Sequence, residues 1–580
     1  MTVEEYRRPG LGWKRALAVS VAAGIALAGC VDLLGKKGDA AEPAALESPL
    51  GSYLAGRYAR ANRDTRAAVD FFEAALAEDP DNMVLRNRTF LLMLADGKVA
   101  RALELAPSLV EEPQTASMAE MLLAADHVRA GRLKQAAASI GEPNDRGFGA
   151  LLKPLFLAWL EAGLGNVETV ERRLDELSDR EAFVPFRDFH AALILDYLGA
   201  NAAARTAYEQ FREKNGTATS VALAFGSFLR RHGDDAEAEA VYVELLESAP
   251  DNPAVSRALA ALKAGEPAAP YIADVKDGIA EALFGAGGAL ARESGRDAAR
   301  IYVNIALHMK PEFDSALVLL GEILDLDRRW AEAIDVYRRI PKSSPYYWEV
   351  RVRIASNFDR IDKVDEAVAE LEKIADERRD DNEAIVALAD LLRQRERYAE
   401  ASEAYDRAIA RVPELQERHW ALFYSRGVTL ERTKRWERAE ADFLKALELK
   451  PEQPLVLNYL GYSWVEQNRN LDRALKMIEK AVSQRPNDGY IVDSLGWVLY
   501  RMKDYNGAVR HLERAVELRP EDPVINDHLG DAYWQVGRRL EARFQWRHAL
   551  GLDPDEDEID KIKAKLEKGL PGLARADARD

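Results

Sequence analysis

The stretch SLGWVLYRMKDYNGAVRHLERAVELRP, from Ser494 to Pro520, is followed by a second stretch of the same design, HLGDAYWQVGRRLEARFQWRHALGLDP, from His528 to Pro554. Small, bulky and proline positions of the two stretches coincide after a shift of 34 residues. The coinciding positions are Leu495, Gly496, Leu499, Ala508, Leu512, Ala515 and Pro520 in the first stretch, and Leu529, Gly530, Tyr533, Ala542, Trp546, Ala549 and Pro554 in the second. A spacing kept at so many positions predicts that one structural unit recurs along the chain.

A 34-residue unit with small residues at fixed interior points is typical of two antiparallel helices joined by a tight turn. The glycine and the first alanine let the two helices approach closely, and the bulky positions fill the space beside them. The proline ends the second helix, because it has no N–H and its φ is fixed. One hairpin cannot bury its apolar face alone, so neighbouring hairpins are expected to stack into a solenoid.

In spacing and residue types, these stretches resemble the tetratricopeptide repeat (TPR) family. The resemblance implies an all-α fold, a right-handed superhelical TPR solenoid of stacked helical hairpins. In that family the first helix of each pair lines a concave face that receives extended or helical peptides. The resemblance therefore implies a protein that binds other proteins.

The same positions recur through most of the chain. An N-terminal, degenerate TPR array is predicted over residues 51–264, with unit boundaries between Ser108 and Asp188 left open. The run from Gly265 to Pro270 holds two prolines and predicts a hinge or domain boundary over residues 265–271. A more regular array is predicted over residues 272–556, with a small insertion near Glu414 to Trp420. The acidic start of residues 557–580 predicts a capping helix followed by a loose tail.

The N-terminus has the pattern of an export signal. Four basic residues precede an apolar run from Ala16 to Ala28, which is typical of a secretory signal peptide and short for a membrane span. The ending Leu27-Ala28-Gly29-Cys30 resembles the bacterial lipobox, which implies that Cys30 is lipidated and becomes the mature N-terminus. An uncleaved anchor with an incidental cysteine is the alternative. Residues 1–29 are thus expected to be a lipoprotein signal peptide and residues 30–50 a flexible tether.

The residue after the lipidated cysteine helps to sort such lipoproteins between membranes. An aspartate at this place favours the inner membrane, whereas this chain has Val31. The resemblance therefore implies the outer membrane, with the protein facing the periplasm.

Composition argues against several kinds of partner. The formal net charge of the chain is -18. A nucleic-acid-binding protein would be expected to show a basic face, so no nucleic acid is expected as a partner. The same charge argues against a chain that rests flat on anionic lipid.

No motif predicts catalysis. The eight histidines form no HExxH or paired metal-ligand spacing, and no cysteine is left beside Cys30. The run Gly285-Ala286-Gly287-Gly288 is not followed by the Lys-Ser/Thr of a phosphate loop, and Gly287 falls on the glycine position of the repeat. We therefore expect no enzyme activity, no cofactor, no metal site and no small-molecule substrate.

The concave face is where a partner peptide is expected. In the last regular repeats, the inward positions predicted to form a peptide-binding groove are Asn458, Tyr462, Asp493, Trp497, Tyr500, Arg501, Asp527 and Trp534. Four of these are aromatic and the others are polar or charged, which is the composition that peptide-binding hot spots favour. The alternative is that the aromatic side chains pack between successive hairpins as core.

Taken together, the chain resembles a TPR lipoprotein of the Gram-negative bacterial envelope. The resemblance implies a non-catalytic scaffold or adaptor that assembles an envelope complex, such as secretion, pilus, polysaccharide export or peptidoglycan machinery. The alternative is a periplasmic chaperone or quality-control factor. An adaptor would bind few partners in a fixed ratio, whereas a chaperone would bind many unfolded clients weakly.

Replacement of the lipobox cysteine tests the predicted anchor. Cys30→Ser removes the sulfur to which lipid would be attached. The substituted protein should therefore no longer be recovered in the detergent extract of the membrane fraction. Metabolic labelling with a radioactive fatty acid and fractionation of cells expressing each form provide the measurement. Unchanged fractionation and unchanged labelling would contradict the lipobox.

Overall fold

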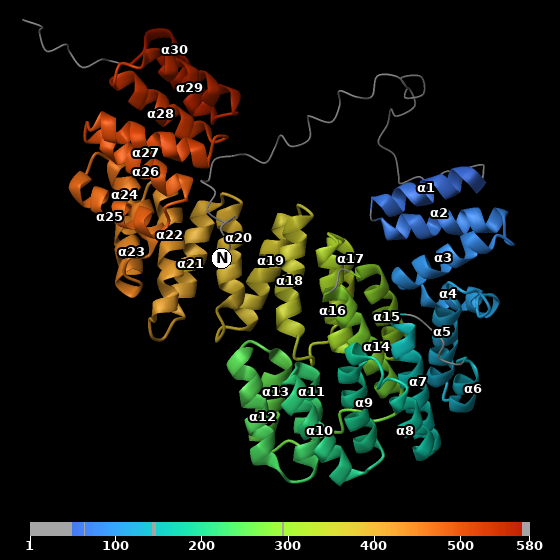
Figure 1. The fold of residues 1–580 in the computed structure, drawn as a ribbon. Helices are drawn as coiled ribbons and strands as arrows, with labels where there is room; N and C mark the ends of the chain where they lie inside the picture. The colour runs from blue at the N-terminus through green and yellow to red at the C-terminus, as the bar shows by residue number, and fades with distance from the viewer. Residues whose placement is uncertain (1–48, 63, 142–146, 293–294, 571–580) are drawn as a thin grey trace, which may run out of the picture. The chain divides into compact units, whose positions relative to one another are not determined.

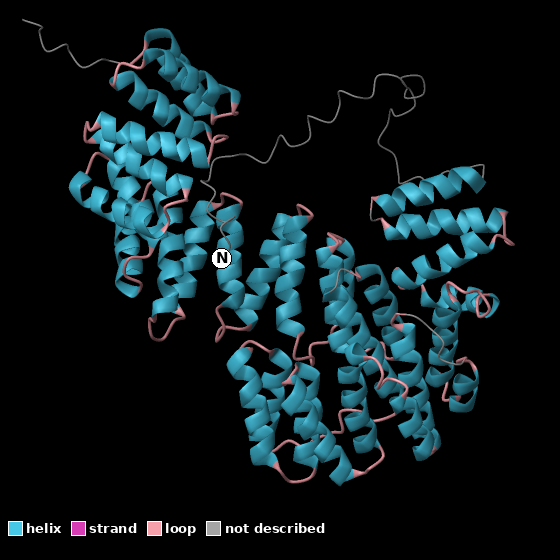
Figure 2. Ribbon diagram, in the orientation of Figure 1, coloured by secondary structure: helices cyan, strands magenta, loops and turns pink. Residues whose placement is uncertain are grey.

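The computed structural model describes residues 49–62, 64–141, 147–292 and 295–570. Over these residues the chain is helical, with no strand (Figure 2), so the predicted all-α fold is confirmed. The signal peptide, Cys30, almost all of the tether and the tail after residue 570 lie outside the described residues.

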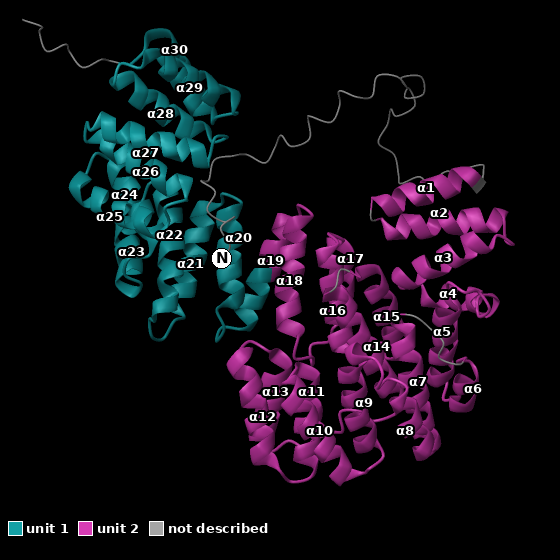
Figure 3. Ribbon diagram, viewed as in Figure 1, with its two compact units in different colours: residues 1–37, 371–580 teal, residues 38–370 magenta. Residues whose placement is uncertain are grey.

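The chain divides into two compact units, one of residues 38–370 and one that includes residues 371–580 (Figure 3). We call them the N-terminal unit and the C-terminal unit. The N-terminal unit contains α1 (Pro49–Ala61), α2 (Thr65–Glu78), α3 (Met83–Ala95), α4 (Val99–Leu105), α5 (Ala116–Arg129), α6 (Leu133–Ala138), α7 (Gly149–Leu164), α8 (Val167–Asp175), α9 (Val184–Tyr197), α10 (Asn201–Asn215), α11 (Thr219–Arg231), α12 (Asp235–Ser248), α13 (Pro253–Lys263), α14 (Val275–Arg292), α15 (Arg296–Met309), α16 (Asp314–Leu326), α17 (Trp330–Tyr337) and α18 (Tyr347–Arg360). Short 3-10 helices cover Ala106–Ser108 and Glu181–Phe183.

The C-terminal unit begins within α19 (Val364–Glu377). It continues with α20 (Glu383–Gln394), α21 (Tyr398–Ala410), α22 (Trp420–Arg432), α23 (Trp436–Leu449), α24 (Pro454–Glu466), α25 (Leu471–Gln484), α26 (Gly489–Arg501), α27 (Tyr505–Leu518), α28 (Pro523–Gln535), α29 (Arg539–Gly551) and α30 (Glu556–Lys568). The insertion near Glu414 to Trp420 contains a 3-10 helix, Glu417–His419.

Hairpins that have the repeat's glycine are closed by a contact between that glycine and a bulky residue of the second helix. A Cβ added to Gly496 would lie 2.5 Å from Cγ of Leu512, and one added to Gly530 would lie 2.5 Å from Cδ1 of Trp546. Such distances are too short for real atoms, so only glycine allows the helices to approach this closely. The contact occurs in both units, since a Cβ added to Gly287 of the N-terminal unit would lie 2.6 Å from Cγ2 of Val303.

Polar caps and prolines set the helix ends. The Asp504 side chain accepts a hydrogen bond from the Gly507 N–H at 2.9 Å and so begins α27. The same helix ends at Leu518, two residues before Pro520. Asp522 then begins α28 by accepting bonds from two backbone N–H groups at 3.0 Å. These features place the turns where the 34-residue period predicts them.

The N-terminal unit departs from a simple stack of neighbours. Helix α14 packs on α7 and α9, and α15 packs on α3 and α5, although these pairs are far apart in the sequence (Figure 1). Gly278 of α14 lies against the indole of Trp159 in α7. Asn304 of α15 donates a hydrogen bond to the Leu94 carbonyl oxygen at 2.8 Å. The later hairpins of this unit therefore complete the core of the earlier ones.

The predicted hinge over residues 265–271 is not where the chain divides. The segment is irregular, as its prolines require, but it lies inside the N-terminal unit. Ser227 donates a hydrogen bond to the Ala269 carbonyl oxygen at 2.6 Å, and Tyr271 donates one to Glu281 at 3.0 Å. The packing of α14 on α7 and α9 joins the two sides of the segment, and the division falls between residues 370 and 371.

Two glycine substitutions with opposite expected signs test the hairpin contact. Gly496→Ala should lower the free energy of unfolding by about 1–3 kcal/mol, because the methyl group overlaps Leu512. Gly551→Ala, at the end of α29, meets nothing within 4 Å and should leave stability unchanged or raise it by up to about 1 kcal/mol. Urea unfolding of both variants is the measurement. Equal effects of the two changes would contradict the assigned contact.

Candidate functional site

The predicted groove residues lie on three neighbouring first helices of the C-terminal unit. Helix α24 carries Asn458 and Tyr462, and α28 carries Asp527 and Trp534. The other four, Asp493, Trp497, Tyr500 and Arg501, belong to α26, which packs on both α24 and α28. The repeat thus places residues about 34 positions apart on adjacent helices.

A stack of three rings forms the centre of this surface. Trp497 lies parallel to Tyr500, with ring centroids 4.8 Å apart, and parallel to His528 at 3.9 Å. The indole N–H of Trp497 donates to Glu466 at 2.6 Å. His528 in turn is held by Asp493 at 2.9 Å. Hydrogen bonds to the middle ring, Trp497, and to one outer ring, His528, therefore fix the orientation of the stack.

Four of the predicted groove residues are buried, and two of these, Asn458 and Asp493, lie within the helix layer. Asn458 is 3% exposed and Asp493 is fully buried, so neither presents its side chain to a partner in this structure. Asp493 lies where α26 meets α28 and binds His528, which explains why a carboxylate is tolerated there. The prediction of these two as ligand contacts is therefore replaced by a supporting role within the helix layer.

The chain's own C-terminus covers the last two predicted positions. Lys565 of α30 binds Asp527 at 2.6 Å and Asp531 at 2.8 Å. The indole N–H of Trp534 donates to the Leu570 carbonyl oxygen at 2.8 Å. Asp527 and Trp534 therefore hold the segment that closes the last hairpin.

Burial changes the acidity of two groups beside this closure. Burial, and the neighbouring charge of Asp527, raise the pKa of Asp531 to about 6, although Lys565 opposes the shift. Burial also raises the pKa of Tyr500 to about 12, with the nearby Asp531 adding to the effect. Tyr500 thus stays a neutral phenol, able to donate a hydrogen bond, at any physiological pH.

What remains open is a smaller surface than the one predicted. Tyr462, Trp497, Tyr500 and Arg501 are half-buried, and Glu466 beside them is exposed. We call these five residues the aromatic row. Arg501 and Glu466 lie 3.7 Å apart and give the row one charge of each sign. Sequence reasoning missed the part played by His528, although its interval of 35 residues from Asp493 was available as a signal.

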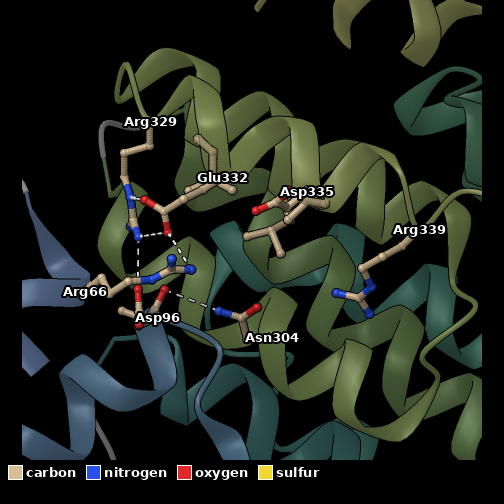
Figure 4. Close-up of a pocket in the computed structure, with 11 residues that line it drawn as sticks. Arg66, Asp96, Asn304, Arg329, Glu332, Asp335 and Arg339 are labelled. Atoms are coloured by element: carbon tan, nitrogen blue, oxygen red, sulfur yellow. Dashed lines mark hydrogen bonds and ion pairs between the residues drawn. The ribbon is translucent and has the colours of Figure 1, made fainter. Parts of the chain in front are cut away.

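A second candidate is a cavity of about 220 Å³ in the N-terminal unit (Figure 4). Its walls come from α2, α3 and α15 to α17, with Ala95, Leu320, Leu324 and Val336 as apolar residues and Arg66, Asp96, Asn304, Arg329, Glu332, Asp335 and Arg339 as polar ones. Arg329 lies 3.0 Å from Asp96 and 2.5 Å from Glu332. Burial raises the pKa of Asp96 even with this partner present.

The charges of this cavity mostly satisfy one another. The side chains of Arg329 and Asp96 are both more than nine-tenths buried, and they join α17 to the end of α3 across more than 200 residues of sequence. The cavity therefore lies beside a structural ion pair. Within the described ranges no group of three or more His, Cys, Asp or Glu side chains is placed to hold a metal ion. None of the helices in those ranges has the length and apolar character to cross a bilayer.

Comparison with known proteins identifies the repeat. A model of the tetratricopeptide repeat matches residues 190–253, 286–347, 353–414 and 386–454. A second model, described as a TPR repeat, matches residues 496–537. The TPR repeat-containing protein PA4667 of Pseudomonas aeruginosa is 27% identical over 189 residues, which are 32% of this chain and 31% of that protein. The match thus spans about a third of the relative's length.

Several solved structures align with this chain at low sequence identity. The Cut9–Hcn1 hetero-tetramer of the APC/C aligns over 91% of this chain and 97% of that chain, with 16% identity and a TM-score of 0.36. Yeast Tom70 aligns over 90% of this chain and 95% of its own, with 13% identity and a TM-score of 0.29. YrrB, described as a TPR protein with an unusual peptide-binding site, aligns over 33% of this chain and 97% of its own, with 21% identity and a TM-score of 0.27.

Removal of the buried arginine tests the connection between α17 and α3. Arg329→Ala leaves Asp96 without its main partner and should lower the free energy of unfolding by about 3–5 kcal/mol. Arg328→Ala is the matched control, because Arg328 is exposed and its loss should cost under about 0.5 kcal/mol. Chemical unfolding followed by circular dichroism gives both values. A similarly small loss in the free energy of unfolding for the two variants would show that the ion pair does not stabilise the N-terminal unit.

Proposed function

Because models of the tetratricopeptide repeat match residues 190–253, 286–347, 353–454 and 496–537, we propose that the chain is a non-catalytic scaffold or adaptor that holds protein partners of one complex in the bacterial envelope. TPR proteins generally mediate protein–protein interactions, and this part of the assignment follows from the repeat. The finer proposal is that the chain is anchored by lipid at Cys30 and faces the periplasm from the outer membrane.

The aromatic row carries the proposal. Trp497 and Tyr500 are half-buried and stacked, so their ring faces are already fixed before any partner arrives. Preorganised aromatic side chains bind with a small loss of conformational entropy, and such residues dominate many interfaces. Arg501 and Glu466 beside them offer one charge of each sign. This chemistry suits an extended or helical peptide with an apolar anchor and flanking charges.

The sequence supports the proposed location. The basic start, the apolar run from Ala16 to Ala28 and the ending Leu27-Ala28-Gly29-Cys30 are those of a lipoprotein signal, and Val31 favours the outer membrane. An anchored scaffold confines its partners near the membrane and raises their local concentration without any new contact.

A photo-crosslinker placed in the row tests the scaffold function. With benzoylphenylalanine in place of Tyr500, irradiation of living cells should give one dominant adduct with an envelope protein. The adduct should be lost when Trp497→Ala is added, because the ring that stacks against position 500 is then missing. Mass spectrometry of the purified adduct identifies the partner.

The same crosslinker in place of Phe544 is the matched control, since this residue is 63% exposed on the second helix of the next hairpin. It should give no adduct with the same protein. A broad set of unrelated adducts from position 500 would favour the chaperone, and no adduct at all would reject the row as a binding surface.

A further inference from the structure

The first helix of the N-terminal unit exposes an apolar stripe. Leu50, Leu54 and Tyr58 follow one another at intervals of four residues, and their exposed fractions are 66%, 52% and 74%. This spacing places all three on one face of α1. On the opposite face, Gly56 and Ala59 are buried against α2, the second helix of this hairpin.

The last hairpin of the chain, in contrast, is covered by a further helix. At the C-terminal end, α30 covers the last hairpin, with Ile562 only 1% exposed and Lys565 bound to Asp527 and Asp531. Terminal repeats need a polar outer face to stay soluble, and an exposed apolar face marks an interaction site. The stripe on α1 therefore needs an explanation that the cap at the other end does not.

The charge around the stripe is basic. Helix α1 has no acidic residue, whereas Arg57 and Arg60 are both exposed, in a chain with a net charge of -18. The first carboxylate after the helix, Asp64, accepts a hydrogen bond from the Ala67 N–H at 2.9 Å and begins α2. An apolar face flanked by arginines is the pattern of a helix that lies in the interface of an anionic bilayer.

The distance along the chain fits the same partner. Eighteen residues, 31–48, lie between Cys30 and Pro49, the first residue of α1. A flexible segment of this length spans about 25 Å on average and at most about 65 Å. A lipid at Cys30 would therefore keep α1 within reach of the membrane surface.

We propose that α1 is a second membrane attachment, whose stripe of Leu50, Leu54 and Tyr58 enters the headgroup region of an anionic lipid bilayer. The inference rests on the proposed lipid anchor at Cys30. Contact through one terminal helix also agrees with the acidic charge of the whole chain, which disfavours a flat orientation on anionic lipid.

A second copy of the chain suits this face less well. A two-fold symmetric contact through α1 would bring the arginines of both copies to one interface. Like charges at a small apolar interface oppose association. The bilayer instead supplies negative charge and an apolar layer together.

A fluorescent probe on α1 of the full-length, membrane-extracted protein gives the test. Because Cys30 is the only cysteine, its lipidation would leave no free thiol, and Leu54→Cys would then accept an environment-sensitive maleimide dye at one place. In vesicles of phosphatidylethanolamine and phosphatidylglycerol, the dye at position 54 should shift its emission to the blue and be quenched by a nitroxide lipid. The same dye after Leu326→Cys, at a leucine 62% exposed on α16, should show neither change.

The arginines provide a second arm. Arg57→Gln combined with Arg60→Gln should lower the apparent affinity of the protein for these vesicles by about 5-fold for each charge removed. More lipid should then be needed for the same quenching at position 54. Vesicles of phosphatidylcholine alone should weaken it in the same way. Equal quenching at positions 54 and 326 would overturn the proposal. Equal quenching at position 54 in anionic vesicles and in phosphatidylcholine vesicles would overturn it as well. A blue shift that needs no vesicles and grows with protein concentration would also overturn it, in favour of a second copy.

The control for the anchor is separate. If Cys30 of the unsubstituted protein does not react with maleimide while the dye at position 54 stays in water, the anchor stands and the proposal for α1 fails. If Cys30 reacts freely, the anchor fails. Lipid-dependent quenching at position 54 after Cys30→Ser would then support α1 as a membrane-binding element by itself.

Discussion

The structure depends on the close approach of two helices at the repeat's glycine. Gly496 and Leu512, or Gly530 and Trp546, occupy a space in which no Cβ fits, so each hairpin has one spacing and one register. That geometry fixes which residues of the first helix remain on the outside. Trp497 and Tyr500 lie on the same helix as Gly496, so the position of the aromatic row depends on how this hairpin closes.

The N-terminal unit shows how a repeat array can gain contacts beyond its neighbours. Helices α14 and α15 return to α3, α5, α7 and α9, and a buried arginine, Arg329, binds Asp96 at the end of α3. Surfaces that would be free for a partner in a simple stack are thus used within the unit. In the C-terminal unit the rings of the aromatic row on α24 and α26 stay half-buried, and α30 covers the last hairpin.

The candidate site could be predicted only in part from the sequence. The period places Tyr462, Trp497 and Tyr500 on adjacent helices, and the structure leaves these rings half-buried. Sequence position does not reveal that Asp493 is fully buried against His528, because the partner lies on another helix. It also does not reveal that Lys565 reaches back to Asp527, because side chains that meet across 38 residues leave no local pattern.

The sequence by itself determined the all-α fold, the hairpin period and the turns. Each of these follows from local physics: the steric limit on glycine, the missing N–H of proline and the caps at helix starts. Only the tertiary structure decided where the chain divides, which predicted site residues are buried and which end is covered. Residues 265–271 have the composition of a hinge, yet the packing of α14 on α7 encloses them in one unit. Burial between distant helices is a sum over many contacts, and no short stretch of sequence contains that sum.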